Sequence, residues 1–271
     1  MPVVALICVG LVAGVASGMF GIGGGVIIVP ALSLLLGFEL KAATGTSLAA
    51  LLMPVSIFAV VAYNRAGILR WRVAAPVALG LIGGAVAGAN IALSLPTQTL
   101  QQLYGIFLVW IGWRFAEPRK FYAAYRAGLL GKKDPAAVAL AEMNASPWIL
   151  LAVGLGAGVL SGMFGIGGGV VIVPALVALL KFDQKVAVAT SLAALLLPVS
   201  AGAVITYYQA GLLDFGVAAL VAVGLIAGAF VGAKIAIALP SATVKRLYGI
   251  FLILVGLRFL GVFDWLFRAN P

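Results

Sequence analysis

Residues 17–25 read Ser-Gly-Met-Phe-Gly-Ile-Gly-Gly-Gly, and residues 161–169 repeat the same nine letters. Each copy interrupts a long apolar run, residues 3–36 and 148–180. One straight helix through either run would be about 50 Å long, whereas the hydrocarbon core of a bilayer is roughly 30 Å thick. Because glycine disfavours the interior of a helix, we expect each run to form a helix, a glycine turn and a second helix. The turn would then lie inside the membrane.

The composition supports a membrane location. Of the 271 residues, 64% are hydrophobic and only 9% are charged, and the mean hydropathy is +1.23. A soluble domain cannot bury that much apolar surface, so the sequence predicts an integral membrane protein of several helices. Continuous apolar runs favour helices over a barrel, in which apolar and polar residues alternate.

The same composition argues against several classes of site. The chain has no histidine and one cysteine, so we expect no disulfide framework, no metal site and no cofactor. All seven Asp and Glu residues lie near predicted helix ends or in the charged central segment, which argues against an enzyme or a carboxylate proton relay. The net charge of +10 is scattered over loops, which indicates the cytoplasmic side of a membrane and not a nucleic-acid partner.

The rest of the first half also returns in the second, always 144 residues later. Thr-Ser-Leu-Ala-Ala-Leu-Leu at residues 46–52 reappears at 190–196, and Leu-Tyr-Gly-Ile-Phe-Leu at residues 103–108 reappears at 247–252. The halves align without a gap, which indicates an internal duplication.

We therefore divide the chain into a first membrane repeat (1–116), a linker (117–147) and a second membrane repeat (148–271). The predicted fold is an all-α polytopic membrane protein of two repeats, each with a glycine-broken first segment and five segments when half-helices are counted. Besides the broken segment, hydropathy predicts three helices in the first repeat, at about residues 42–63, 73–95 and 100–115.

Charge predicts how the repeats face. If both repeats point the same way, eleven of the 17 Lys and Arg residues fall on one side of the membrane and six on the other. If the second repeat is inverted, the division is fourteen to three. The positive-inside rule therefore favours inverted repeats, with the linker in the cytoplasm and both termini outside.

Inverted repeats with broken helices are typical of transporters. A break leaves backbone N–H groups unpaired at the start of the next half-helix, and in hydrocarbon these groups need a partner. An anion supplies one, and the positive end of the helix dipole favours it. We expect the two turns, residues 21–25 and 165–169, to meet near the bilayer midplane with an anion between them. The alternative is that these glycines only allow close helix packing.

Hydroxyl side chains near the turns are further candidates, since they can donate hydrogen bonds to an oxyanion. Their alternative role is hydrogen bonding within or between helices. The candidate substrate-binding residues are Ser17, Gly21, Gly23, Gly24, Gly25, Thr46, Ser47, Ser161, Gly165, Gly167, Gly168, Gly169, Thr190 and Ser191.

Two prolines inside predicted helices need their own interpretation. Pro54 and Pro198 cannot donate helix bonds to the carbonyls of Ala50 and Ala194. We interpret each as a plain kink, with a hinge or a carbonyl site for a cation as alternatives.

The doubled motif resembles the TauE/SafE family of sulfite and organosulfonate permeases. The resemblance rests on Ser-Gly-x-x-Gly-x-Gly-Gly-Gly followed by Val-Pro, at residues 17–30 and 161–174. It also rests on Ala-Thr-Ser at residues 189–191, which is altered to Gly-Thr-Ser at residues 45–47. It implies a multi-pass carrier of the bacterial cytoplasmic membrane that moves a sulfur-containing anion such as sulfite or sulfoacetate.

From the residues and this resemblance we expect a secondary transporter for a small anion, working by alternating access. A passive anion channel is the alternative, and dependence of accumulation on an ion gradient would separate the two. The sequence leaves open a coupling proton or sodium ion and assembly into a homo-oligomer.

Overall fold

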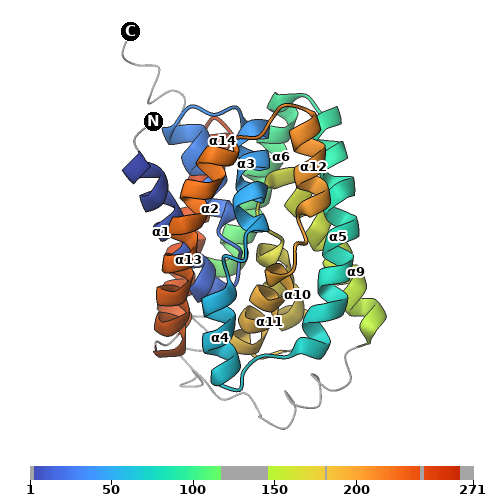
Figure 1. Cartoon of the computed structure of the whole chain (residues 1–271), viewed down its shortest axis with the longest axis vertical. Coiled ribbons are helices and arrows are strands. Elements are labelled where there is room, and N and C mark those ends of the chain that lie inside the picture. Colours follow the sequence, from blue (N-terminus) through green and yellow to red (C-terminus); the bar gives the residue numbers. More distant parts are fainter. Residues whose placement is uncertain (1–2, 117–145, 181, 239–240, 263–271) are drawn as a thin grey trace. The chain divides into compact units, whose positions relative to one another are not determined.

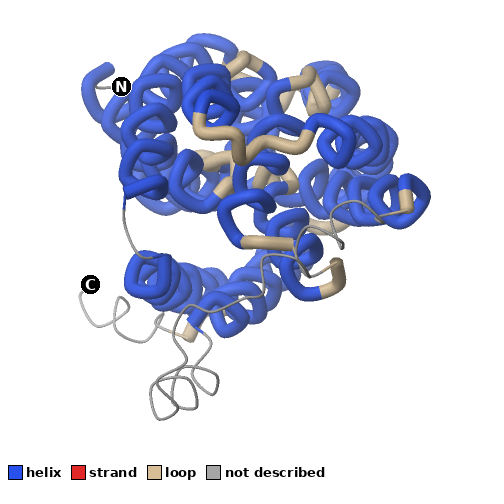
Figure 2. Tube along the Cα trace, turned by 90° about the horizontal axis from the view of Figure 1, so that it is seen from below, coloured by secondary structure: helices blue, strands red, loops and turns tan. Residues whose placement is uncertain are grey.

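The computed structural model describes residues 3–116, 146–180, 182–238 and 241–262 (Figure 1). Apart from Ser146 and Pro147, the predicted linker lies outside these residues. Throughout the described residues the chain forms helices and loops, without a strand (Figure 2). The predicted all-α fold is therefore confirmed.

The second half repeats the helix order of the first. In chain order the helices are α1 (Val3–Phe20), α2 (Gly25–Pro30), the π-helix η1 (Ala31–Leu35), α3 (Leu40–Leu52), α4 (Ile57–Arg65), α5 (Trp71–Ser94), α6 (Thr97–Ala116), α9 (Pro147–Phe164), α10 (Gly169–Ala178), α11 (Gln184–Leu196), α12 (Ala201–Gln209), α13 (Phe215–Ala238) and α14 (Ser241–Phe259). Every helix of the second half begins 144 residues after its counterpart, the same offset as the sequence repeat.

Within the described residues, four helices are long and apolar enough to cross a membrane by themselves, namely α1, α5, α9 and α13. Two further spans are bent pairs, α3 with α4 at 49° and α11 with α12 at 52°. The interpretation of Pro54 and Pro198 as plain kinks is therefore corrected, because each helix stops and a new one begins. The physical reason lies one residue earlier: Met53 and Leu197 have ψ angles of 150° and 153°, the extended backbone that a following proline favours.

Two compact units are formed, each from helices of both repeats. The first contains α1 to α5 and α9 to α13, and the second pairs α6 with α14. In the second unit, Gly105 of α6 lies against Gly256 of α14, and the rings of Tyr104 and Phe259 meet edge to face at 5.1 Å.

Glycines at every fourth position bring helices of the first unit close together. Added Cβ atoms at Gly80, Gly84 and Gly88 of α5 would overlap backbone carbonyls of α9, and those at Gly154, Gly158 and Gly162 of α9 would overlap carbonyls of α5. The same spacing joins α1 to α13, at Gly224, Gly228 and Gly232. Small residues at this spacing let helix backbones approach in a membrane, where the hydrophobic effect does not drive association.

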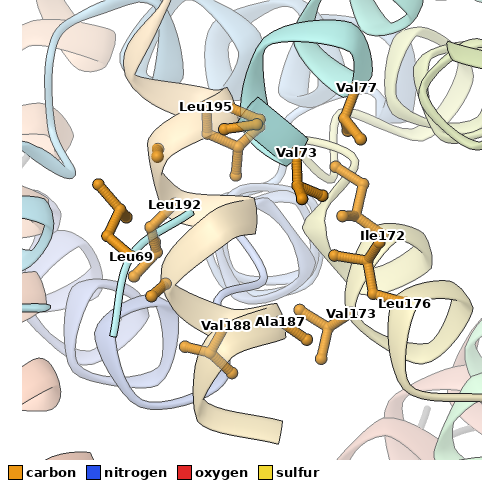
Figure 3. Close-up of a cluster of buried hydrophobic side chains, with 14 of the residues drawn as sticks. Leu69, Val73, Val77, Ile172, Val173, Leu176, Ala187, Val188, Leu192 and Leu195 are labelled. Atoms are coloured by element: carbon orange, nitrogen blue, oxygen red, sulfur yellow. The ribbon is translucent and has the colours of Figure 1, made fainter. Parts of the chain in front are cut away.

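The core of the first unit also mixes the two repeats. In Figure 3, Val73 and Val77 of α5 lie beside Ile172, Val173 and Leu176 of α10, with side chains of α11 next to them. All of these side chains are buried. The repeats therefore interlock, and this positions the two glycine turns.

Candidate functional site

Both glycine runs break the helix as predicted. After α1 ends, Gly21, Gly23 and Gly24 have φ angles of 69°, 82° and 85°, and α2 begins at Gly25. The second run has the same geometry, with φ between 69° and 78° at Gly165, Gly167 and Gly168. Positive φ of this size is strained for residues that carry a Cβ, which accounts for the glycines.

The two turns lie against each other. An added Cβ at Gly25 would overlap the carbonyl oxygen of Gly165, and one at Gly169 would overlap the carbonyl oxygen of Gly21. Between them, an added Cβ at Gly23 would lie 3.4 Å from the Cα of Gly167. Glycine at these positions thus allows the two repeats to approach closely, and it also allows the backbone conformation of the turn.

Three backbone carbonyls around the first break, those of Ser17, Gly18 and Gly21, accept hydrogen bonds. The N–H of Gly21 donates to Ser17 O (2.7 Å), and the Tyr63 hydroxyl of α4 donates to Gly18 O (3.0 Å). The Ser191 hydroxyl of the other repeat donates to Gly21 O (2.7 Å). The second break has the same three bonds: Gly165 N–H to Ser161 O (2.8 Å), Tyr207 hydroxyl to Gly162 O (3.0 Å) and Ser47 hydroxyl to Gly165 O (2.8 Å).

Backbone amides at the breaks have no such partners. Within the described residues, the N–H groups of residues 22–26 and 166–170 donate to no acceptor. The next amides return to the helical pattern, with Ile27 and Ile28 both donating to Gly24 O. An unpaired buried amide carries a desolvation cost that a hydrogen-bond acceptor would remove. Each turn therefore offers a run of unpaired donors to a solute.

A small cavity lies between the turns and the two bent spans. Its walls come in equivalent pairs from the two repeats, together with Leu192: Ser17 and Ser161, Gly23 and Gly167, Leu51 and Leu195, Val55 and Val199, Ser56 and Ser200. The free volume is about 10 Å³, room for about one water molecule. The cavity is therefore closed to any larger solute in this conformation.

The four serines of the cavity divide into two kinds. Ser56 and Ser200 donate to helix carbonyls of the opposite repeat, Leu192 O at 3.1 Å and Leu48 O at 3.2 Å. The Ser17 and Ser161 hydroxyls make no hydrogen bond to the described part of the chain, although both residues are buried. Two uncommitted donors thus face one small space.

Not all predicted site residues reach the cavity. Ser47 and Ser191 use their hydroxyl protons on the turn carbonyls. Thr46 Oγ1 accepts from the N–H of Asp214 at 3.2 Å, and buried Thr190 Oγ1 has no partner within the described residues. The structure thus brings Ser17, Ser161, Gly23 and Gly167 to the cavity wall, and the other candidates do not line it.

Sequence reasoning missed seven cavity residues: Leu51, Val55, Ser56, Leu192, Leu195, Val199 and Ser200. A signal for them existed, because Pro-Val-Ser occurs at residues 54–56 and again at 198–200. A helix break that brings a serine into the interior could have been expected from the proline two residues before it.

Broken helices around a buried cavity, with up to six candidate spans among the described residues, are typical of a multi-pass membrane transporter. The chain belongs to the family described as "Sulfite exporter TauE/SafE", whose model matches residues 6–259. The resemblance stated from the sequence is therefore confirmed.

Curated relatives carry names that agree with this class. The chain is 28% identical to the probable membrane transporter protein YunE of Bacillus subtilis, over 97% of this chain and 100% of the relative. It is 29% identical to a probable membrane transporter protein of Methanocaldococcus jannaschii, over 85% of each chain. No solved structure matches the chain.

Proposed function

We propose that this protein is a secondary transporter that moves a small sulfur-containing anion across the bacterial cytoplasmic membrane by alternating access. A sulfonate such as sulfoacetate, or sulfite, fits this class, in keeping with the family description. The observation that carries the proposal is the run of unpaired backbone amides at each of the two turns.

These amides favour an anion as the ligand. Each turn offers consecutive unpaired N–H groups, which can donate hydrogen bonds to an anion. The amides lie where α2 and α10 begin, so the helix dipoles add positive potential. The cavity wall carries no charged side chain, so neutral donors would bind the anion.

Alternating access is supported by the arrangement of the repeats. In Figure 1 the loop after α4 lies at the bottom of the first unit and the equivalent loop after α12 at the top. We propose that the repeats are inverted in the membrane, in agreement with the charge distribution, so that the two bent spans open the cavity to opposite sides. The closed cavity then corresponds to an occluded state of the cycle.

The two uncommitted serines provide the sharpest test. Ser17→Ala and Ser161→Ala remove a donor without breaking a hydrogen bond of the described chain, so folding should be preserved. A hydrogen bond to a charged group contributes about 1.5–3 kcal/mol, so each variant should weaken anion affinity about tenfold or more. Ser94→Ala is the matched control, because its hydroxyl only donates to Ile91 O on an exposed face.

The measurement is uptake of radiolabelled sulfite and sulfoacetate by proteoliposomes, with and without a proton or sodium gradient. Accumulation above equilibrium that depends on a gradient would support a coupled carrier, whereas equilibration alone would indicate a passive channel. Unchanged affinity in the Ser17→Ala, Ser161→Ala double variant would overturn the placement of the site. The turn glycines are less useful positions, because positive φ makes any side chain there a folding problem.

A further inference from the structure

Two leucines lie directly on the glycine turns. The Cδ1 atom of Leu195 lies 3.2 Å from the position a Cβ would take at Gly23, and the Cδ1 atom of Leu51 lies 3.0 Å from the same position at Gly167. Each leucine therefore covers the turn of the other repeat. Both side chains line the cavity.

Both leucines sit beside the helix breaks. Leu51 is the second-last residue of α3 and Leu195 the second-last residue of α11, so the bends of 49° and 52° follow immediately. Leu195 is visible near the end of its helix in Figure 3. A change in either bend would move the attached leucine relative to the turn it covers.

The cavity cannot accept an anion until the side chains of Leu51 and Leu195 move. A free volume of about 10 Å³ holds about one water, whereas a sulfonate brings three oxygens and a carbon around its sulfur. The oxygens would face the amides of the turns. The organic group must then point away from the turns, into the volume that Leu51 and Leu195 occupy with Val55 and Val199.

We propose that Leu51 and Leu195 are specificity-determining residues that set the size of the organic group and cover the anion site in its closed state. This inference rests on the proposed function and deepens it. It assigns the substrate's apolar part to contacts with two side chains that sequence reasoning did not single out.

The first test uses a homologous series of linear alkanesulfonates, from methanesulfonate to hexanesulfonate, as competitors of uptake. Leu51→Ala and Leu195→Ala remove the branched end of the side chain, so the preferred chain length should increase. Each additional CH₂ that becomes buried should improve affinity about fourfold. Leu52→Ala and Leu196→Ala are matched controls, because these neighbours do not line the cavity and should keep the wild-type profile.

The second test needs no substrate. In a Cys8→Ser background, which removes the chain's one cysteine, Ser17→Cys and Ser161→Cys are labelled with the anionic reagent sulfonatoethyl methanethiosulfonate. Adding Leu51→Ala and Leu195→Ala together should raise the labelling rate several-fold, because the covers are shortened. Adding Leu52→Ala and Leu196→Ala together should leave the labelling rate unchanged. If the alanine variants fail to fold, Leu51→Val and Leu195→Val provide a milder truncation.

The two proposals fail differently. Labelling rates and chain-length profiles that match the Leu52 and Leu196 controls would overturn the role of Leu51 and Leu195, while wild-type sulfonate transport could stand. Faster labelling without competition by any anion would support the leucines as covers, but would overturn the anion as the substrate.

Discussion

The Ser47 hydroxyl donates a 2.8 Å hydrogen bond to the carbonyl oxygen of Gly165, a residue 118 positions away in the other repeat. Ser191 makes the equivalent bond to Gly21 at 2.7 Å. Each repeat therefore holds the other's glycine turn through α3 or α11.

Removing this pair of hydroxyls should destabilise the turns. Ser47→Ala leaves a buried carbonyl without its donor, which costs about 1–3 kcal/mol. We expect a lower thermal unfolding temperature in detergent, and a larger drop in the Ser47→Ala, Ser191→Ala double variant. Ser47→Thr keeps a hydroxyl and is the control for the change of side chain. An unfolding temperature equal to wild type in the double variant would contradict this role.

The tyrosines that cap the broken helices should contribute in a similar way. Tyr63→Phe keeps the buried ring but removes the donor to Gly18 O, at the end of α1. We expect a loss of about 1–3 kcal/mol, measured by thermal unfolding. Tyr207→Phe should cost about the same, because its bond to Gly162 O has the same length of 3.0 Å. Tyr208→Phe, at an exposed neighbour, should behave as wild type.

Neighbouring glycines of α5 should respond with opposite sign to the same substitution. An added Cβ at Gly84 would overlap the carbonyl of Leu155 in α9, so Gly84→Ala should destabilise by about 1–3 kcal/mol. At Gly83 the nearest atom is 3.7 Å away, an ordinary contact. Gly83→Ala should stabilise the helix by about 0.5–1 kcal/mol. Unfolding of both variants in the same detergent would reveal the difference, and equal effects would argue against close packing of α5 on α9.

Two lysines should stabilise the ends of the long helices. Lys41 Nζ donates to Leu93 O at 3.3 Å, near the end of α5, and Lys185 Nζ donates to Ile237 O at 3.1 Å, near the end of α13. A cation at a helix C-terminus contributes about 0.3–1 kcal/mol. Lys41→Met should lower the unfolding temperature slightly, and Lys41→Arg should restore it. If the unfolding temperature of Lys41→Arg is as low as that of Lys41→Met, the cause is the loss of the lysine's aliphatic stem and not of its charge.

Much of the fold was predictable from the sequence because the signals are local and doubled. The glycine runs predicted the breaks at Gly21 and Gly165 through backbone conformation alone. Long apolar runs predicted the spans, and α5 begins and ends within two residues of the predicted helix at residues 73–95.

The parts that were missed depend on contacts between the repeats. The serine after each break reaches the other repeat, as in the bond from Ser56 to Leu192 O, and the sequence alone does not specify that partner. The candidates Thr46 and Thr190 lie in α3 and α11, which do contribute to the cavity wall, but their own side chains do not line the cavity. The direction of a hydroxyl around a helix is set by packing, which periodicity does not resolve among so many small apolar residues.

Both compact units draw helices from each half of the chain, and the hydroxyl–carbonyl bonds at the turns cross between the halves. An N-terminal fragment that ends after residue 116 and a C-terminal fragment that begins before residue 146 would therefore complement each other when co-expressed. Neither fragment would be stable without the other. Two separate genes, each encoding one half, could thus assemble the same site as a heterodimer.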